Sequence, residues 1–128
     1  METETKNILL RIDADPRLAA AVGGAARYLA DAAGMENDAV AQLQAAVIAA
    51  CRELFSSLKE DHPSLNVTLT RLPDRIEVSL SHEGTSSQAA GLDGKEAPTG
   101  IDRIQHETQG NLVVTRLTKY INQDAPSR

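Results

Sequence analysis

The chain has 128 residues, of which 41% are hydrophobic and 24% are charged, and its formal net charge at pH 7 is −5. This size and balance are typical of one globular domain and exclude a disordered or low-complexity chain. The acidic balance provides no basic face for phosphates, so we do not expect a nucleic-acid partner. The prediction is a single domain over residues 1–128.

Cysteine content and the first residues indicate the compartment. Cys51 is the only cysteine, which excludes an intramolecular disulfide and a multi-cysteine zinc site and is typical of a reducing compartment. The opening METETKN lacks the basic and apolar regions of a signal peptide, and no stretch of about 18 apolar residues is present to span a bilayer. We therefore expect a cytoplasmic protein with no membrane partner.

The first third of the chain reads as a strand followed by a helix. Residues 7–13 (NILLRID) form a short run of branched aliphatics bounded by polar residues, which predicts a strand. Asp15 followed by Pro16 predicts a helix N-terminus, and Gly34 a helix end. The glycines at 23–24 weaken this helix. Their presence has two explanations: a neighbour packs closely there, or the glycines are simply tolerated. Residues at helical spacing are Leu18, Val22, Ala25, Leu29 and Ala33.

A second helix is the firmest element of the pattern. Glu36 or Asn37 can cap it, and it is predicted to end near Asp61 and Pro63. Cys51 lies among its apolar positions, where a lone cysteine indicates core packing rather than a nucleophile. The residues that recur at three- and four-residue steps are Val40, Leu43, Val47, Ala50, Leu54 and Leu58.

The rest of the chain reads as two hairpins separated by a loop. LNVTLTRL and RIEVSLSH alternate with a period of two around a turn at Pro73 and Asp74. The stretch from Glu83 to Gly100 has little periodicity and predicts a loop. DRIQHET and LVVTRLTKYI form the second hairpin, joined across residues 109–111. Residues predicted to face the core from the first hairpin are Val67, Leu69, Ile76, Val78 and Leu80.

The order β-α-α-β-β-loop-β-β predicts the fold class. We expect an α+β two-layer sandwich, in which two long helices cover one face of a mostly antiparallel sheet. The other face is then solvated or available for association.

Three segments carry a resemblance to a known family. These are ACRELFSSLKE in the second helix, DRIEVSLSHEG in the third strand and GNLVVTRLTKYI at the last strand. With this order of elements, the chain resembles the anti-sigma regulatory factor and serine-protein-kinase branch of the GHKL ATPase fold, which histidine kinases, gyrase B and MutL share. The resemblance covers nearly the whole chain and implies a histidine-kinase-like ATPase fold.

The resemblance assigns a catalytic position to the second helix. The family carries a Glu, which activates a water or hydroxyl, and four residues later an Asn that coordinates the magnesium bridging the phosphates. Here ELFSS places Glu53 at the first position and Ser57 at the second. A serine hydroxyl is a poorer magnesium ligand than an amide oxygen. Glu53 as a surviving general base competes with its interpretation as a solvated or ion-paired side chain.

The resemblance also assigns the positions that bind adenine. The family motif Asp-x-Gly-x-Gly follows the third strand, and its Asp accepts from the adenine amino group. This chain has His82 and Gly84 at the first two positions and Ser86 at the last. A neutral imidazole accepts one hydrogen bond and only weakly mimics a carboxylate. Three scattered histidines, His82 and His106 among them, lack metal-ligand spacing, and we predict no metal site.

The phosphate-binding part of the family site is the third departure. Its Gly-x-Gly sequence leads into a helix whose N-terminal amides hold phosphates. Gly91, Gly94 and Gly100 are present here, but the surrounding residues have no apolar period and Pro98 interrupts them. The positions that contact the ligand differ from the family motifs, whereas the positions that pack in the core agree with them. The sequence therefore predicts a scaffold that has lost nucleotide binding and needs no cofactor.

Two functions from different classes follow from the resemblance. The first is a regulatory domain that binds a bacterial sigma factor, an anti-sigma antagonist protein or a second copy of itself as a homodimer. The alternative is an anti-sigma-factor serine kinase that uses ATP and Mg, with Glu53 as base and Ser57 as an altered magnesium ligand. A third interpretation is a sensor-kinase-like accessory domain that binds another small ligand in the old pocket.

Overall fold

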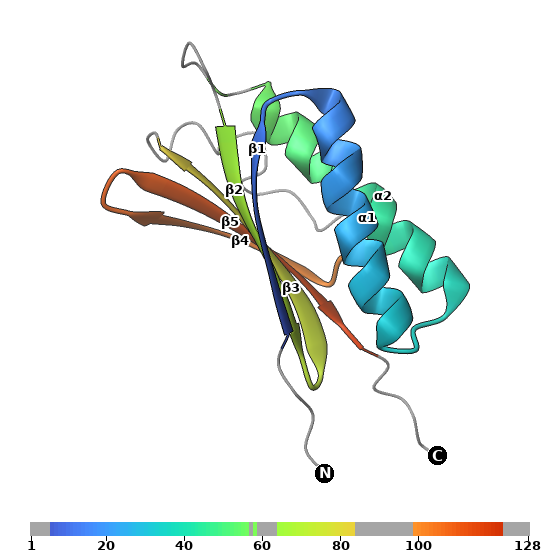
Figure 1. Cartoon of the computed structure of the whole chain (residues 1–128). Helices are drawn as coiled ribbons and strands as arrows, with labels where there is room; N and C mark the ends of the chain where they lie inside the picture. The colour runs from blue at the N-terminus through green and yellow to red at the C-terminus, as the bar shows by residue number, and fades with distance from the viewer. Residues whose placement is uncertain (1–5, 57, 59–63, 84–98, 122–128) are drawn as a thin grey trace.

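The computed structural model describes residues 6–56, 58, 64–83 and 99–121. The elements follow the order that the sequence predicts (Figure 1). Most of the predicted loop lies outside the described residues, since nothing is described between 83 and 99. In chain order the elements are β1 (Lys6–Asp13), α1 (Pro16–Ala32), α2 (Asn37–Phe55), β2 (Ser64–Leu72), β3 (Arg75–Glu83), β4 (Arg103–Gln109) and β5 (Leu112–Tyr120).

The strands form one five-stranded sheet in the order β1-β2-β3-β5-β4. Every neighbouring pair is antiparallel, and both helices lie on the same face of the sheet (Figure 1). The predicted α+β architecture, with two helices over one face of an antiparallel sheet, is therefore confirmed. The β2–β3 hairpin turns at Pro73 and Asp74, and the β4–β5 hairpin turns at Gly110 and Asn111, where Gly110 has a φ of 64°.

Helix α1 begins and ends where its sequence predicts. The Asp15 side chain accepts a hydrogen bond from the backbone N–H of Arg17 at 2.9 Å, and Pro16 occupies the first turn. At the other end Gly34 has a φ of 81°, and the Met35 N–H donates to the Ala30 carbonyl at 3.1 Å. This is the Schellman arrangement, in which a left-handed glycine lets the chain reverse and satisfies the last carbonyls.

Helix α2 is shorter than predicted. It ends at Phe55 rather than near Asp61 and Pro63, which lie outside the described residues. The Ser56 hydroxyl donates to the Glu53 carbonyl at 2.7 Å. This hydrogen bond replaces the backbone N–H that would bind the same carbonyl if the helix continued. Leu58, predicted as a helical core position, therefore lies beyond the helix and is only half-buried.

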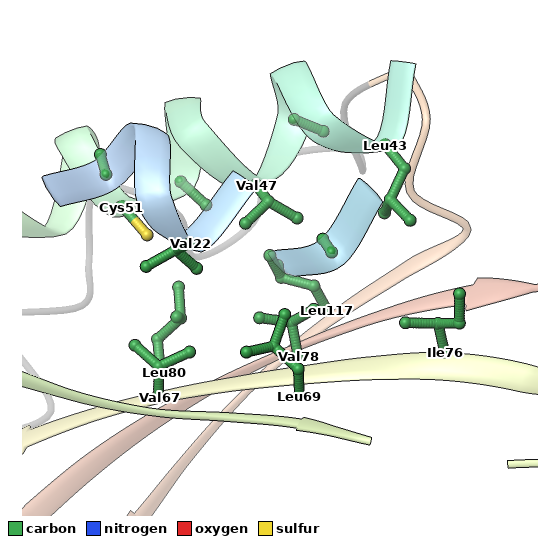
Figure 2. Packing of buried hydrophobic residues seen from close by; sticks show 14 of the residues in the cluster. Val22, Leu43, Val47, Cys51, Val67, Leu69, Ile76, Val78, Leu80 and Leu117 are labelled. Carbon is green, nitrogen blue, oxygen red and sulfur yellow. The ribbon is translucent and has the colours of Figure 1, made fainter. Parts of the chain in front are cut away.

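The hydrophobic core lies between the helices and the sheet. Side chains of β2, β3 and β5 point towards the helices, and Val22, Val47 and Cys51 meet them from above (Figure 2). The five core positions predicted in the first hairpin are all fully buried. The largest fully buried side chains are aliphatic: Leu29, Leu43, Leu54, Leu65, Leu69, Ile76, Leu80, Leu117, Val22, Val40, Val47 and Val67.

The two glycines inside α1 have different environments. A Cβ built on Gly23 would lie 2.5 Å from Cγ1 of Ile48 in α2, whereas a Cβ on Gly24 would meet nothing within 4 Å. Gly23 is buried and Gly24 is exposed. The absence of a side chain at Gly23 therefore allows α1 and α2 to pack closely, and Gly24 is merely tolerated.

Alanine substitutions should separate these two roles. We expect Gly24→Ala to raise the free energy of unfolding by about 0.5–1 kcal/mol, because alanine favours the helix and meets no neighbour. Gly23→Ala should lower it by about 1–3 kcal/mol, because the Ile48 side chain must move. Urea unfolding of both variants measures the difference. The Gly23→Ala penalty should shrink in an Ile48→Ala background; an unchanged penalty there would show that this contact is not its cause.

Candidate functional site

Two of the four residues predicted from the family motifs, Glu53 and His82, are among the described residues, and their burial differs. Glu53 is exposed near the end of α2, and His82 is buried in β3. Ser57 and Gly84 lie outside the described residues, so their predicted roles remain predictions. Arg52 and Lys59 are the neighbours expected to pair with Glu53; no ion pair of Glu53 is found among the described residues, and Lys59 lies outside them.

His82 is the most unusual of the predicted positions. It is 3% exposed and follows Ile76, Val78 and Leu80 along the face of β3 that the helices cover. Its Nδ1 lies 3.0 Å from the backbone oxygen of Glu83. Because a carbonyl oxygen only accepts, Nδ1 carries the proton in the neutral ring, and Nε2 is left as an acceptor. This Nε2 is buried and has no hydrogen-bond partner within the described ranges.

Two further polar residues lie on the same face of the sheet. Thr115 of β5 is fully buried and pairs across the strands with Leu80 on one side and His106 on the other. Nδ1 of His106 lies 3.2 Å from the Thr115 hydroxyl, and Nε2 of His106 is buried without a partner in the described part. His82 pairs with Val113, one row further along β5. We call His82, His106 and Thr115 the histidine patch.

Sequence reasoning found only part of this patch. The family resemblance identified His82 as the counterpart of the adenine-binding Asp, and His106 was considered as a metal ligand and interpreted instead as a surface residue. Thr115 was missed, although the alternation in LVVTRLTKY places it on the same face as Val113 and Leu117. The register between β4 and β5 was the missing information, because it brings His106 opposite Thr115.

The patch can offer the acceptor Nε2 of His82, a ring nitrogen of His106 whose role depends on the tautomer, and the Thr115 hydroxyl, but it holds no described carboxylate. No group of three His, Cys, Asp or Glu residues among those described could hold a metal ion. A neutral imidazole that accepts through one nitrogen can bind one N–H or O–H donor. The chemistry available in the patch is therefore recognition by hydrogen bonding.

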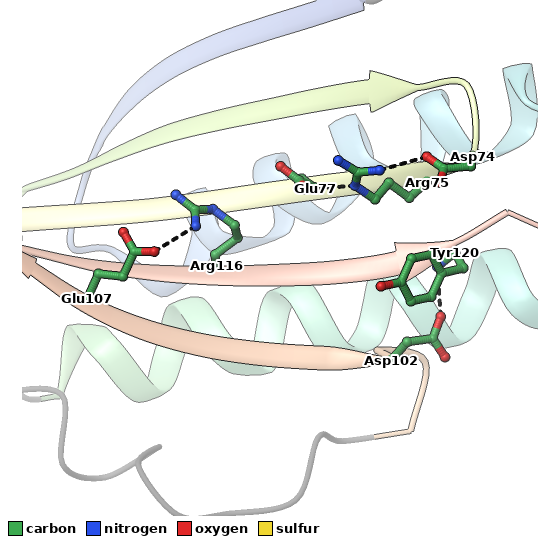
Figure 3. Close-up of polar contacts among 7 residues, drawn as sticks. All are labelled: Asp74, Arg75, Glu77, Asp102, Glu107, Arg116 and Tyr120. Atoms are coloured by element: carbon green, nitrogen blue, oxygen red, sulfur yellow. Dashed lines mark hydrogen bonds and ion pairs between the residues drawn. The ribbon is translucent and has the colours of Figure 1, made fainter.

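Two ion-paired groups of charged residues lie on the outer face of the sheet and its hairpin turn. Arg75 contacts both Asp74 and Glu77 at 2.8 Å, and Arg116 of β5 contacts Glu107 of β4 at 2.9 Å (Figure 3). The hydrogen bond from Arg116 lowers the pKa of Glu107 below its ordinary value, with a smaller effect from Gln109. A carboxylate held ionised in this way supports the strand pairing and is unsuited to accept a proton as a general base.

Replacing the imidazole of His82 tests whether it serves the fold. A buried acceptor without a hydrogen-bond partner lowers the free energy of unfolding, whereas a buried apolar side chain of similar size carries no such penalty. We therefore expect His82→Leu to leave the free energy of unfolding unchanged or raise it by about 1 kcal/mol. Leu80→Ala, the control one row away, should lower it by about 2–5 kcal/mol. A large loss in His82→Leu, measured by urea unfolding, would show that the ring nitrogens stabilise the fold.

Cys51 is a core residue, as its sequence context predicts. The thiol is fully buried on the face of α2 that packs on the sheet (Figure 2). Burial raises the pKa of Cys51 to about 12. Because the thiolate is the nucleophile, this thiol is inert at neutral pH.

Alkylation should report this burial directly. At pH 8 a thiol with a pKa of about 12 is ionised in about one molecule in ten thousand, so iodoacetamide should modify native Cys51 at least about a thousandfold more slowly than an exposed cysteine. The control is Ala49→Cys in a Cys51→Ser background, since Ala49 is exposed on the same helix. Denaturant should remove the difference, and rapid labelling of the native chain would contradict the buried position.

Comparisons with known proteins do not assign this chain to a family. No model of a known family matches the chain, and no similar sequence was found among curated proteins. Neither described helix is long and apolar enough to cross a membrane.

Proposed function

We propose that this chain is a cytoplasmic regulatory domain that acts by binding a protein, in the manner of a bacterial anti-sigma factor, and that it does not depend on ATP. The proposal extends the sequence resemblance to the anti-sigma branch of the GHKL ATPase fold. The element order and the two-layer architecture are compatible with that fold. The partner class, a sigma factor or an anti-sigma antagonist, comes from the resemblance.

The environment of His82 carries the part of the proposal that concerns nucleotide. At the position where the family places an adenine-binding Asp, this chain has a buried imidazole whose Nδ1 proton already binds the Glu83 carbonyl at 3.0 Å. One acceptor nitrogen remains, in place of a carboxylate with two acceptor oxygens and a charge. A hydrogen bond to a charged acceptor is stronger than one to a neutral acceptor. Adenine recognition is therefore weakened at its main contact.

The exposure of Glu53 argues against the kinase alternative. A general base must reach the hydroxyl that it deprotonates, and phosphoryl transfer depends on positioned charges. Glu53 is solvent-exposed and is held by no ion pair among the residues described. With Ser57 at the magnesium position, the kinase mechanism lacks its usual metal ligand, and no ion pair among the described residues positions Glu53 as a base.

Calorimetric titration with nucleotide tests the proposal. We expect no heat of binding for ATP or ADP with magnesium up to millimolar concentration, a limit that corresponds to about 4 kcal/mol of binding free energy. Micromolar binding that is lost in His82→Leu would overturn the proposal and favour the kinase. Micromolar binding that survives in this variant would also overturn it and would place the nucleotide elsewhere.

The protein-binding part of the proposal has its own assay. Purified sigma factors from the host that encodes this chain should bind it without nucleotide, and the complex should reduce transcription by the matching RNA polymerase holoenzyme. The control is the same assay with ATP and magnesium added, which should change neither binding nor transcription. Failure of every sigma factor and of their antagonist proteins to bind would contradict the anti-sigma role.

A further inference from the structure

The described strands place only basic charged residues on the face of the sheet that the helices cover. The strand registers set Lys6 of β1 opposite Arg71 of β2, Arg71 opposite Ile76 of β3, and Ile76 opposite Lys119 of β5. The three cations therefore lie in one row across four neighbouring strands. All other described strand residues on this face are aliphatic, threonine or histidine. We call Lys6, Arg71 and Lys119 the basic row.

The basic row lies at the opposite end of the sheet from the histidine patch. It crosses the first residues of β1 and β3, whereas His82 lies near the last residue of β3. The start of β1 and the turn between α1 and α2 lie at the same end of the domain (Figure 1). The basic row is therefore separate from His82, the position that the family resemblance assigns to adenine.

Arg71 differs from the other described arginines. Four of those form ion pairs with carboxylates, and three more are exposed to water. The paired ones are Arg17, Arg27, Arg75 and Arg116, and the exposed ones without an ion pair in the described part are Arg11, Arg52 and Arg103. Arg71 is half-buried, and within the described ranges it has no carboxylate and its buried Nε has no hydrogen-bond partner.

The pairing of Lys6 with Arg71 is unfavourable without an anion. Like charges directly opposite each other destabilise an antiparallel pair, and a partly buried cation without a counter-charge adds a desolvation cost. Lys119 differs, because its Nζ lies 3.6 Å from the Asp102 carboxylate. An anion bound between Lys6 and Arg71 would reduce both the repulsion and the desolvation cost.

We propose that Lys6 and Arg71 bind one phosphate group, supplied by inorganic phosphate or by a small phosphate monoester. The planar donors of a guanidinium match the oxygens of such an anion, and an ammonium adds a point charge. A phosphate monoester carries about −1.5 to −2 charges at neutral pH, which suits two cations better than the single charge of a carboxylate does. The inference stands independently of the proposed anti-sigma function, since nucleotide binding is tested through His82 and this site through Arg71.

Stability in the presence of phosphate tests the site. Urea unfolding is measured in sodium phosphate and in sodium chloride of the same ionic strength. For a dissociation constant of about 1 mM, about 20 mM phosphate raises the folding equilibrium constant about 20-fold. Arg71→Met, which keeps a long apolar stem and removes the charge, should lose this gain. The matched control Arg103→Met alters an exposed arginine on the outer face of β4 and should keep it.

Stability without phosphate separates binding from folding. Arg71→Met should then fold at least as stably as the wild type, because it removes the charge opposite Lys6 and the unpaired Nε. A large loss of stability would overturn the proposal, because Arg71 would then support the fold itself. The absence of a gain from phosphate would also overturn it. An equal gain in all three proteins would do the same, since it would be a general salt effect.

Chemical shifts of the wild type cover the case in which Arg71→Met fails to fold. In ¹H–¹⁵N spectra, phosphate should shift the Nε–H signal of Arg71 and the backbone amide of Lys6 saturably and leave the Nε–H signal of Arg103 in place. Phosphoserine distinguishes the two sources: the same shifts would support a site for phosphate monoesters, and shifts with phosphate alone would support a site for the inorganic ion. The lack of a saturable shift at Arg71 with either compound would overturn the proposal.

Discussion

Close packing of the two helices on each other, over an aliphatic core that they share with the sheet, is the constraint on which the fold depends. The chain has three aromatic residues and no tryptophan, so large side chains are not available to fill a wide gap between the layers. Ala19, Ala26 and Ala30 of α1 are fully buried, and Gly23 meets α2 with no side chain at all. Small residues let the helices pack on each other, and aliphatic side chains of the helices and the strands fill the core between them.

The same constraint defines where polar chemistry can lie. Along the covered face of β3, the residues are aliphatic from Ile76 to Leu80 and become polar at His82. Thr115 and His106 continue this change on the neighbouring strands. At this end of the face, Nε2 of His82 and Nε2 of His106 are buried without a hydrogen-bond partner among the described residues, as is Nε of Arg71 at the opposite end. Because an unpaired buried acceptor costs free energy, its persistence invites a functional explanation rather than a structural one.

Most of the architecture could be predicted from the sequence because its local signals agree with one another. The caps at Asp15 and Gly34, the helical spacing of the apolar residues and the two-residue alternation of the strands each predicted an element that the structure contains. The end of α2 was predicted too late, because Leu58 continued the apolar period past a serine whose hydroxyl binds the helix carbonyl. Periodicity describes a face of a helix and contains no information about such a competing hydrogen bond.

The candidate site was less predictable because it depends on which strands lie side by side. Family resemblance identified His82 and Glu53, but not that one is buried and the other exposed. The position of β5 between β3 and β4 brings Thr115 and His106 together, and neither residue has a sequence signal of its own. The role predicted for Glu53 requires its side chain to face the site. Only tertiary packing decides which side of that helix is covered and which is exposed.

The pairing of β1 with β2 also has a consequence for synthesis of the chain. Lys6 pairs with Arg71 and Asp13 with Ser64, so the two helices lie between the paired strands in the sequence. The helical hairpin and the β2–β3 hairpin, by contrast, join neighbours in the sequence and form rapidly. Among the described strands β1 is made first, and its partner β2 follows only after both helices. Until β2 is made, the apolar residues of β1 therefore lack the strand that pairs with them in the folded chain.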